Sequence, residues 1–451
     1  KTNGNYIISG HSLAVGVSDI YLSEINQNGT IVWTKTISGP WNGVYNYDII
    51  LTSDGGFVVS GQESLFGAGY IDMFILKFNS SGNLSWAKTI GGTETEYCWS
   101  VKQVSDGGYI LGGYTNSFGA GSNDMYIVKL DANGIFQWNK CIGGTGNDIA
   151  RTVLQATDNN YVIAGSTTSF GSGNADMYIV KLDLNGNLLW NKTFGGTNID
   201  EARKIISTSD GGCVIAGSTN SFGAGNGDMY IVKIDINGNI QWNSVVGSTG
   251  IESAYSIIQT NDGGYAVTGY TNSFGAGNND ILLVKLDING VLQWTKTVGG
   301  SGAELSFGLL NTIDNGYIIA GNTNSFGAAG LDMFIVKFDA AWNTCSNFTN
   351  PVSNYTTGGV VNTPSPTIIS QSPTVENPTP VINTSGNITP ICASVGLLPI
   401  ENELPIEFKL EQNYPNPFNP ETRIKFHLKD KTNTVIKDLR CTWKRIIHSY
   451  K

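Results

Sequence analysis

Residues 228–242 read D-M-Y-I-V-K-I-D-I-N-G-N-I-Q-W, and close copies of this stretch recur along most of the 451-residue chain. The Asp that opens each copy recurs at a spacing of 53 residues once and 52 residues five times, at Asp19, Asp72, Asp124, Asp176, Asp228, Asp280 and Asp332. A Trp follows 14 residues later at Trp33, Trp86, Trp138, Trp190, Trp242 and Trp294, and the degenerate seventh copy has its Trp early, at Trp342. A fixed period of this length predicts a repeat architecture.

Each repeat is predicted to hold four short β-strands separated by turns. The turns are S-D-G-G, as at 209–212, and D-I-N-G, as at 235–238. Asn-Gly between two strands indicates a hairpin, because both residues tolerate positive φ. In the copy that starts near Asp200, the expected strands are 202–208, 213–217, 229–234 and a fourth that carries Trp242.

Four-stranded units of this length predict a β-propeller, since radial repetition leaves only short, protected sheet edges. The second strand of each unit carries a Gly, which counts seven units: Gly10, Gly61, Gly113, Gly165, Gly217, Gly269 and Gly321. The prediction is an all-β, seven-bladed β-propeller of 52-residue four-stranded repeats over residues 1–345; a β-solenoid is the alternative. The first blade lacks its leading strand, which we expect upstream of Lys1, and we expect residues from there to close the ring.

Composition narrows the function classes. The 57 glycines, the 10% aromatic residues and the low 14% of charged residues suit a sheet protein with many tight turns. A net charge of −10 argues against a nucleic-acid partner. No run approaches 18 apolar residues, so we expect no transmembrane segment. We expect a monomer.

The loops divide between two faces, because successive connections of a four-stranded meander alternate. The S-F-G-A-G-x-x-D loops and the inter-unit G-G-T-G-x-D loops therefore share one face, and rigid scaffolds usually carry binding sites on such loops. This face is expected to be acidic, with Asp72, Asp124, Asp176, Asp228, Asp280, Asp332, Glu96, Asp148, Asp200, Glu252 and Glu304. These carboxylates could bind Ca²⁺ or a cationic group. The alternative is that each Asp caps its own loop, and identical placement in every unit favours capping.

Residues that break the repeat are the better guide to a specific site. Trp41, Tyr45, Tyr47 and Trp99 cluster in the first two units and could form an aromatic platform for a glycan, although surface aromatics are common in β proteins. The other irregular residues, Glu63, Glu94, Arg151 and Arg203, form no recognisable acid–base pair. Only three His occur, and no catalytic or metal-binding motif is present. We therefore predict a protein that is not an enzyme and has no metal or cofactor apart from the Ca²⁺ alternative.

The Trp series has a counterpart in a known family. K-[LIF]-[DN]-x-[NS]-G-x-x-x-W resembles the tryptophan-docking repeat of quinoprotein dehydrogenase propellers. The resemblance implies that each indole packs between neighbouring blades. It does not extend to a quinone pocket, and no adjacent Cys-Cys pair is present.

A compositional change separates the repeats from the C-terminal part. Residues 346–399 are rich in Thr, Ser, Asn and Pro and are predicted to form an extended, semi-rigid stalk. Cys345 and Cys392 bracket this linker and could form a disulfide in an oxidising compartment. Cys98, Cys141 and Cys213 replace other residues of sister repeats and are expected to be buried substitutions.

A second resemblance concerns residues 400–433, predicted to be a partial sorting domain. The run N-Y-P-N-P-F-N-P, followed by T-x-I-x-F, resembles the opening of the type A C-terminal sorting domain of the type IX secretion system in Bacteroidota-like bacteria. The resemblance implies a small β-sandwich, export through the outer membrane and a secreted or surface location. Residues 434–451 depart from the family as a basic, unpatterned tail, for which we favour a frameshift or premature end. The motif residues are Asn413, Tyr414, Pro415, Asn416, Pro417, Phe418, Asn419 and Pro420.

Three functions are consistent with these features. The leading prediction is a secreted or cell-surface, non-enzymatic propeller that binds a glycan, protein or ion through its loop face. The alternatives are an extracellular polysaccharide hydrolase or lyase, and a structural surface protein without a specific ligand. A cluster of unmatched carboxylates, Arg and Tyr at the channel mouth would distinguish the enzyme.

Overall fold

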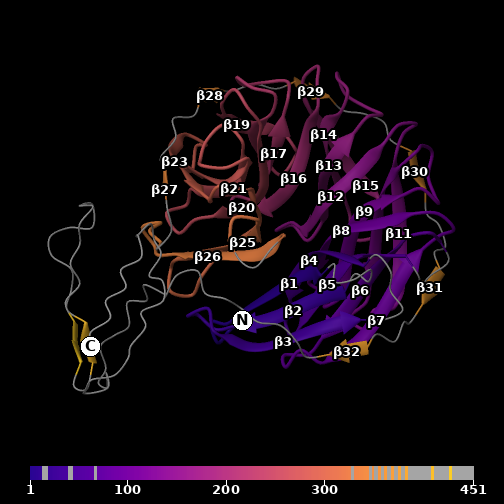
Figure 1. The fold of residues 1–451 in the computed structure, drawn as a ribbon. Helices are drawn as coiled ribbons and strands as arrows, with labels where there is room; N and C mark the ends of the chain where they lie inside the picture. The colour runs from indigo at the N-terminus through magenta and orange to yellow at the C-terminus, as the bar shows by residue number, and fades with distance from the viewer. Residues whose placement is uncertain are drawn as a thin grey trace. The chain divides into compact units, whose positions relative to one another are not determined.

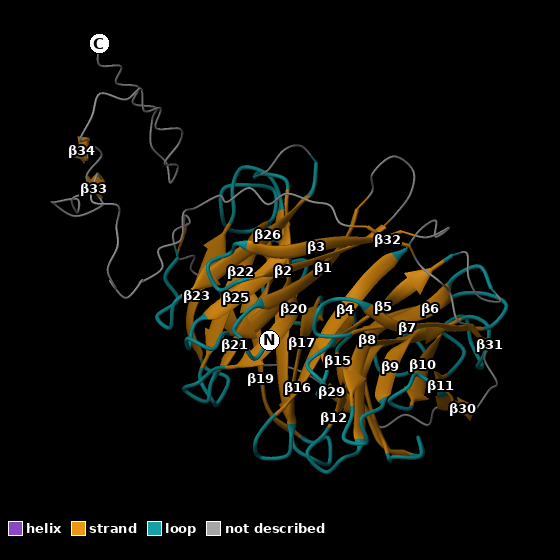
Figure 2. Ribbon diagram, turned by 90° about the horizontal axis from the view of Figure 1, so that it is seen from below, coloured by secondary structure: helices purple, strands orange, loops and turns teal. Residues whose placement is uncertain are grey.

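The computed structural model describes residues 1–12, 19–38, 44–64, 69–326 and 330–344, together with eight short strands beyond residue 347. The chain divides into two compact units, Lys1–Thr389 and Pro390–Lys451. The described residues form strands and loops only (Figure 2). They accordingly contain no helix long and apolar enough to cross a membrane.

The first unit is a seven-bladed β-propeller, as predicted, with its blades arranged around a central space (Figure 1). Blades 2 to 6 each have four antiparallel strands, and blades 1 and 7 have three among the described residues. Blade 1 holds β1 (Tyr6–Ser12), β2 (Asp19–Ile25) and β3 (Ile31–Ser38). Blade 2 holds β4 (Tyr45–Leu51), β5 (Phe57–Glu63), β6 (Asp72–Phe78) and β7 (Leu84–Gly91). Blade 3 holds β8 (Glu96–Gln103), β9 (Tyr109–Thr115), β10 (Asp124–Leu130) and β11 (Phe136–Gly143).

The remaining blades repeat this pattern. Blade 4 holds β12 (Asp148–Gln155), β13 (Tyr161–Thr167), β14 (Asp176–Leu182) and β15 (Leu188–Gly195). Blade 5 holds β16 (Asp200–Ser207), β17 (Cys213–Thr219), β18 (Asp228–Ile234) and β19 (Ile240–Gly247). Blade 6 holds β20 (Glu252–Gln259), β21 (Tyr265–Thr271), β22 (Asp280–Leu286) and β23 (Leu292–Val298). Blade 7 holds β24 (Glu304–Asn311), β25 (Tyr317–Thr323) and β26 (Asp332–Phe338).

The hydrophobic core lies between successive blades. Every residue of β18, from Asp228 to Ile234, is buried, because both faces of this third strand are covered. Its Tyr230 packs in one cluster with Ile179 and Phe194 of blade 4, which shows that the cluster joins two blades. Ring closure brings blade 7 against blade 1, where a Cβ on Gly10 would lie 2.3 Å from Met333 Cε. Closure by residues upstream of Lys1 stays a prediction.

The Trp series packs between blades, as the resemblance implies. A Cβ on Gly238, in the β18–β19 hairpin of blade 5, would lie 3.0 Å from the Trp190 indole of blade 4. Trp342 does not belong to this series, contrary to the prediction. It stands 52 residues after the hairpin glycine Gly290, has φ 62°, and stacks on Tyr317 at 3.7 Å between ring centroids. The sequence pattern hid this because an aromatic residue rarely occupies a left-handed position.

The Lys that precedes the last residue of each third strand forms an ion pair with the Asp of the S-D-G-G turn. Lys233 is 3% exposed, and its Nζ lies 2.8 Å from Asp210 Oδ2. The contact ties the turn between the first two strands to the third strand, which explains the constant 23-residue separation. It recurs in blades 2 to 7 as Lys77–Asp54, Lys129–Asp106, Lys181–Asp158, Lys233–Asp210, Lys285–Asp262 and Lys337–Asp314.

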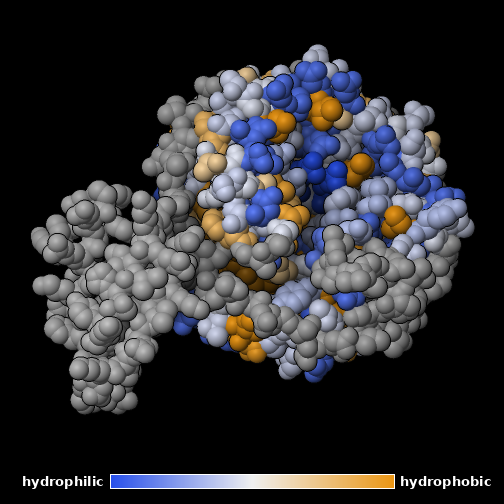
Figure 3. Space-filling view, in the orientation of Figure 1, coloured by the Kyte–Doolittle hydropathy of each residue, from blue (hydrophilic) through white to orange (hydrophobic). Residues whose placement is uncertain are grey.

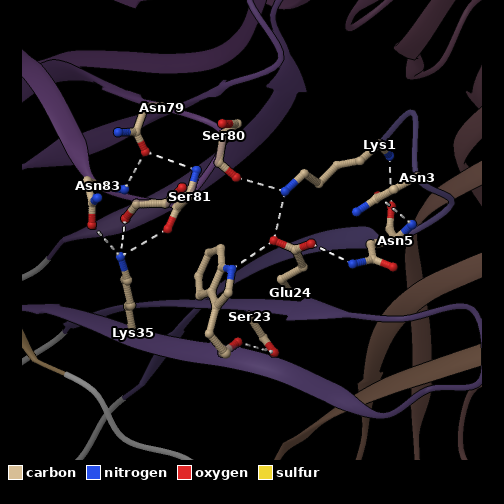
Figure 4. A network of polar contacts seen from close by, with 12 residues as sticks. Lys1, Asn3, Asn5, Ser23, Glu24, Lys35, Asn79, Ser80, Ser81 and Asn83 are labelled. Atoms are coloured by element: carbon tan, nitrogen blue, oxygen red, sulfur yellow. Dashed lines mark hydrogen bonds and ion pairs between the residues drawn. The ribbon is translucent and has the colours of Figure 1, made fainter.

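Blade 1 carries the same pair with its charges exchanged (Figure 4). Lys1 occupies the position of the turn Asp, and Glu24 occupies that of the strand Lys. Lys1 Nζ lies 2.8 Å from Glu24 Oε2, which also accepts a hydrogen bond from Trp33 Nε1 at 2.7 Å. The other oxygen of Glu24 accepts one from Asn5 Nδ2 at 2.6 Å. The position therefore requires opposite charges, in either order.

Six short strands beyond residue 347 pair with the outermost strands of blades 6 to 1, in that descending order (Figure 1). Each adds an antiparallel fifth or fourth strand at an edge that would otherwise expose unpaired backbone groups. The prediction that residues 346–399 form an extended, semi-rigid stalk stays a prediction. The strands are β27 (Phe348–Thr349), β28 (Asn354–Thr356), β29 (Val360–Asn362), β30 (Thr367–Ile369), β31 (Thr374–Glu376) and β32 (Val381–Asn383), paired with β23, β19, β15, β11, β7 and β3.

The described part of the second unit is one antiparallel pair, β33 (Phe408–Leu410) with β34 (Phe426–Leu428). The sorting motif at 413–420, the tail at 434–451, and both Cys345 and Cys392 lie outside the described residues. The predictions made for them stay predictions.

Candidate functional site

The loop carboxylates that were candidates for cation binding are buried within their own loops. Asp124 is 1% exposed, and its Oδ2 accepts hydrogen bonds from the backbone N–H groups of Ala120 and Gly121, both at 3.0 Å. The same arrangement caps the loops of Asp176 and Asp228. Asp72 accepts such a bond from Gly69, and Asp280 accepts them from Gly277 and Ala276, while Asp332 is half-buried. These contacts are those of the loop-capping alternative.

The inter-unit carboxylates are buried as well. Glu96, Asp148, Asp200, Glu252 and Glu304 have no exposed surface, so the expectation of an open acidic face is wrong. Each instead holds the loop between two blades by accepting backbone and hydroxyl hydrogen bonds, as Glu96 does from Gly92 N and Thr115 Oγ1. Among the described residues, no group of three His, Cys, Asp or Glu side chains is placed to hold a metal ion.

At the end of each of blades 2 to 6, the loop Asp of that blade and the first carboxylate of the next blade lie close together. A Cβ on Gly247 would lie 1.9 Å from Asp228 Oδ1 and 2.6 Å from Glu252 Oε2, so only glycine fits between them. Burial, together with the neighbouring Glu252 charge, raises the pKa of Asp228 to about 6. Burial also raises the pKa of Asp124, Asp176 and Asp280.

These carboxyl groups predict a stability maximum in mildly acidic solution. Burial opposes ionisation of Asp210, but hydrogen bonds from Lys233 and Thr208 outweigh it and lower its pKa to about 2, so its stabilisation is lost as the pH falls below about 4. Asp228 acts in the opposite sense: its stabilisation is complete below about pH 4 and is lost as the pH rises through about 6. Urea unfolding at pH 3, 5 and 8 should give the largest free energy of unfolding at pH 5.

One variant tests whether Asp228 causes the loss of stability between pH 5 and pH 8. Asn in place of Asp228 keeps an oxygen for the Ala224 and Gly225 N–H groups and cannot ionise. The Asp228→Asn protein should therefore lose less stability between pH 5 and pH 8 than the parent chain. Equal losses in the two proteins would show that Asp228 does not titrate in this range.

A second set of residues lines the central channel and differs from blade to blade. Each of the six innermost strands has a β-bulge at the same place, which leaves one residue without a partner on the neighbouring strand. Bulges re-aim side chains and are frequent beside functional sites. The bulge residues, here called the channel ring, are Tyr47, Trp99, Arg151, Arg203, Tyr255 and Phe307, at a constant spacing of 52.

The channel ring is nearly continuous around the channel. The rings of Tyr47 and Trp99 lie 4.2 Å apart, and the guanidinium carbon of Arg151 lies 4.4 Å from the Trp99 ring. On the other side, Arg203 lies 5.3 Å from the Tyr255 ring. Tyr255 in turn makes an edge contact with Phe307, with 5.4 Å between centroids. Four aromatic rings and two guanidinium groups therefore meet from six blades.

Solvent reaches the channel ring. Tyr47 is 36% exposed and Phe307 is 49% exposed, while Trp99, Arg151 and Tyr255 are half-buried. Figure 3 shows a hollow at the centre of the molecule, with strongly hydrophilic side chains gathered around it. The walls supply both flat apolar surfaces and positive charge.

A charged layer lies one residue further along the same strands. Asp48 Oδ2 accepts hydrogen bonds from Ser100 Oγ and Val101 N, both at 3.1 Å, and from Lys102 Nζ at 3.3 Å. Burial opposes the ionisation of Asp48, but Lys102 and Lys204 lower its pKa. Lys204 belongs to blade 5, so this interaction with blades 2 and 3 crosses the channel.

The middle part of the inner strands is positive, although five of these strands begin with a buried carboxylate: Glu96, Asp148, Asp200, Glu252 and Glu304. Between their second and seventh residues, the described charges are four cations and two carboxylates, a net charge of +2 against −10 for the whole chain. The cations are Lys102, Arg151, Arg203 and Lys204, and the carboxylates are Asp48 and Glu201. Low-dielectric walls strengthen the field of such a cluster inside a channel.

Only part of this site was predicted from the sequence. The structure brings Tyr47 and Trp99 together, while Tyr45 contacts His11 instead, with 5.1 Å between ring centroids. Trp41 lies outside the described residues. Arg151 and Arg203 were recognised only as irregular, and Tyr255 and Phe307 were missed. Aligning the repeats at the residue before Asp48, Ser100, Thr152, Lys204, Ser256 and Gly308 would have shown that this position varies from repeat to repeat.

The other irregular residues do not join the channel ring. Glu63 is buried at the end of β5, and Glu94 is exposed in the loop after β7. Cys98, Cys141 and Cys213 are free and buried, as predicted. Burial raises the pKa of each of these thiols to about 12, so they are packing residues.

Comparisons with known proteins agree with the propeller. A family model described as a domain of unknown function (DUF5122) β-propeller matches residues 105–134 and 156–188, each of which runs from an S-D-G-G-type turn to the next hairpin. The chain thus contains a β-propeller repeat domain. The regulatory protein FlaEY of Caulobacter vibrioides is 28% identical over 41% of this chain and 22% of its own length, so the chain spans less than a quarter of that relative.

Solved propellers give weaker likenesses. The WD40 domain of Neurospora crassa Pan2 has a TM-score of 0.43 and 10% identity, covering 69% of this chain and 85% of that domain. Puromycin hydrolase has a TM-score of 0.43 and 11% identity, covering 77% of this chain and 53% of that enzyme.

Proposed function

We propose that this protein is a non-enzymatic binding module that holds a glycan at the channel ring. The observation that carries the proposal is the break in symmetry at one repeat position. A scaffold requirement recurs in every blade, as the loop carboxylates do, whereas the channel ring changes from aromatic to cationic and back. Its side chains contact one another across blade boundaries and remain open to solvent.

Aromatic rings suit a glycan because they offer rigid apolar faces to the C–H surface of a sugar at little cost in side-chain entropy. Tyr47 and Trp99 present two such faces only 4.2 Å apart, on strands β4 and β8. The polar groups of the same channel would hydrogen-bond sugar hydroxyls, which is the combination expected of a small-molecule site. The resemblance of residues 413–420 to a sorting signal supports a secreted or surface location as part of this proposal.

Loss of one aromatic face should weaken binding measurably. With the full chain and a panel of oligosaccharides, isothermal titration should find at least one binder, and Trp99→Ala should weaken it about tenfold or more, as expected for about 1.5 kcal/mol of ring contact. Tyr70→Ala is the control, because Tyr70 is 73% exposed in the loop between β5 and β6 and is not a residue of the channel ring. This control should bind like the parent chain.

The same titrations contain the results that would defeat the proposal. If no oligosaccharide of the panel binds, the ligand is not a glycan. If the parent chain and Trp99→Ala bind with equal affinity, the binding site is not in the channel. Shortening of a polysaccharide by the protein would favour the hydrolase or lyase alternative. Thermal melting of both variants shows whether they are folded, so a loss of binding can be separated from a loss of structure.

A further inference from the structure

We infer that the channel ring selects anionic sugars, and that Arg151 and Arg203 bind the carboxylate of a uronate residue while the flanking rings hold the sugar. The inference rests on the proposed function and assigns its ligand class. The two Arg side chains come from adjacent inner strands, β12 and β16, at the same bulge position. They therefore face the channel side by side.

Aromatic rings flank the two guanidinium groups on both sides. Arg151 lies 4.4 Å from the Trp99 ring, and Arg203 lies 5.3 Å from the Tyr255 ring. Contact with an aromatic ring orients a guanidinium group without using its N–H donors. The donors lie in the plane of the group and point outward from its edges. The Nη donors of Arg151 and Nη1 of Arg203 thus stay available to a ligand held between Trp99 and Tyr255.

The hydrogen-bonding capacity of the pair is largely unused. Arg203 Nη2 donates to Glu201 Oε2 at 2.7 Å, whereas no described acidic side chain forms an ion pair with Arg151. The Nε atoms of both residues are buried and have no acceptor among the described residues. A carboxylate accepts two parallel hydrogen bonds from a guanidinium group, and here it would do so from the Nη atoms.

Charge favours the same class of ligand. Two adjacent guanidinium groups repel each other, and burial together with Arg203 lowers the pKa of Arg151. Glu201 forms an ion pair with only one of them, Arg203. An anion placed between Arg151 and Arg203 relieves this repulsion, while a neutral sugar does not.

A carboxylate has two oxygens in one plane and can accept the paired N–H donors of a guanidinium fork edge to edge. The ligand assigned here is therefore a glycan that contains uronic acid. A sulfated glycan shares the negative charge but not the planar geometry, and it serves as the second arm of the test.

The experiment compares hexagalacturonate with its methyl ester, which has the same backbone without the charge. Titrated into the full chain at 50 mM salt, the free acid should bind at least tenfold tighter than the ester, and 500 mM salt should remove most of the difference. Arg151→Gln and Arg203→Gln should each reduce the preference, while Arg151→Lys should keep part of it because it retains charge without the fork.

The outcomes separate this inference from the proposed function. Equal binding of acid and ester overturns the inference and leaves glycan binding intact. If neither the acid, nor the ester, nor any neutral sugar binds, the proposed function and the inference are both overturned. Tighter binding of a sulfated hexasaccharide than of the uronate overturns the carboxylate assignment. The comparison of acid with ester uses the unaltered chain, so it decides the question even where an Arg variant fails to fold.

Discussion

Replacing Glu24 by Ala should lower the free energy of unfolding by about 3–5 kcal/mol, the range for breaking a buried ion pair from one side. The Glu24 side chain is 5% exposed and that of Lys1 is 13% exposed, so the ammonium would be left without a counter-charge. The donors of Trp33 and Asn5 would lose their acceptor as well. Chemical denaturation followed by Trp fluorescence measures the loss.

The matched control is the equivalent pair in blade 7, where the side chains of Lys337 and Asp314 are 32% and 46% exposed. Because solvent screens this pair, Asp314→Ala should cost only about 0–1 kcal/mol. Glu24→Gln should fall between the two, since it keeps acceptors but loses the charge. Equal losses for Glu24→Ala and Asp314→Ala would mean that burial does not set the strength of this repeated contact.

Replacing Gly290 by Ala should cost about 2–5 kcal/mol, from two separable causes. Its φ of 78° is left-handed, which costs a non-glycine residue about 1–2 kcal/mol. A Cβ would also lie 2.4 Å from the Trp242 indole of the preceding blade, and forcing that ring aside costs about 1–3 kcal/mol more.

Gly29 isolates the first cause. It occupies the equivalent hairpin position of blade 1, has the same φ of 78°, and has no atom within 4 Å of its Cβ position. Gly29→Ala should therefore cost about 1–2 kcal/mol, and the difference between the two variants measures the inter-blade indole contact. Thermal melting of the two variants provides the comparison. Equal shifts in melting temperature would mean that the contact between the hairpin glycine and the indole does not contribute to stability.

The fold was predictable because its determinants are local and repeated. Turn chemistry at S-D-G-G and D-x-N-G specifies where each strand ends, and the period counts the blades. Boundaries differed slightly: β16 begins at Asp200 rather than residue 202, because Asp200 and Glu201 already pair with Thr219 and Ser218 of β17. The sequence favoured loop capping for the repeated Asp side chains, and their hydrogen bonds to loop N–H groups agree with it. Their burial was not expected, because a charged residue in a loop is usually exposed.

The site was less predictable because its parts are far apart in the chain. Trp99 and Arg151 are 52 residues apart, and only the packing of blade 3 against blade 4 brings them to 4.4 Å. Whether either side chain faces the channel depends on a one-residue bulge, which no composition or motif shows. The strands β27 to β32 escaped prediction for a related reason, since an edge partner is defined by its neighbour.

The sequence by itself therefore determined the all-β class, the seven blades, the hairpins and the residues that link each blade to the next. These follow from local φ preferences and from a side-chain pattern repeated every 52 residues. The tertiary structure alone decided that six bulge residues meet as one channel ring, that Trp342 fills a glycine position, and that the loop carboxylates are buried. The physical reason is that these features depend on contacts between blades, whose geometry exists only once the ring has formed.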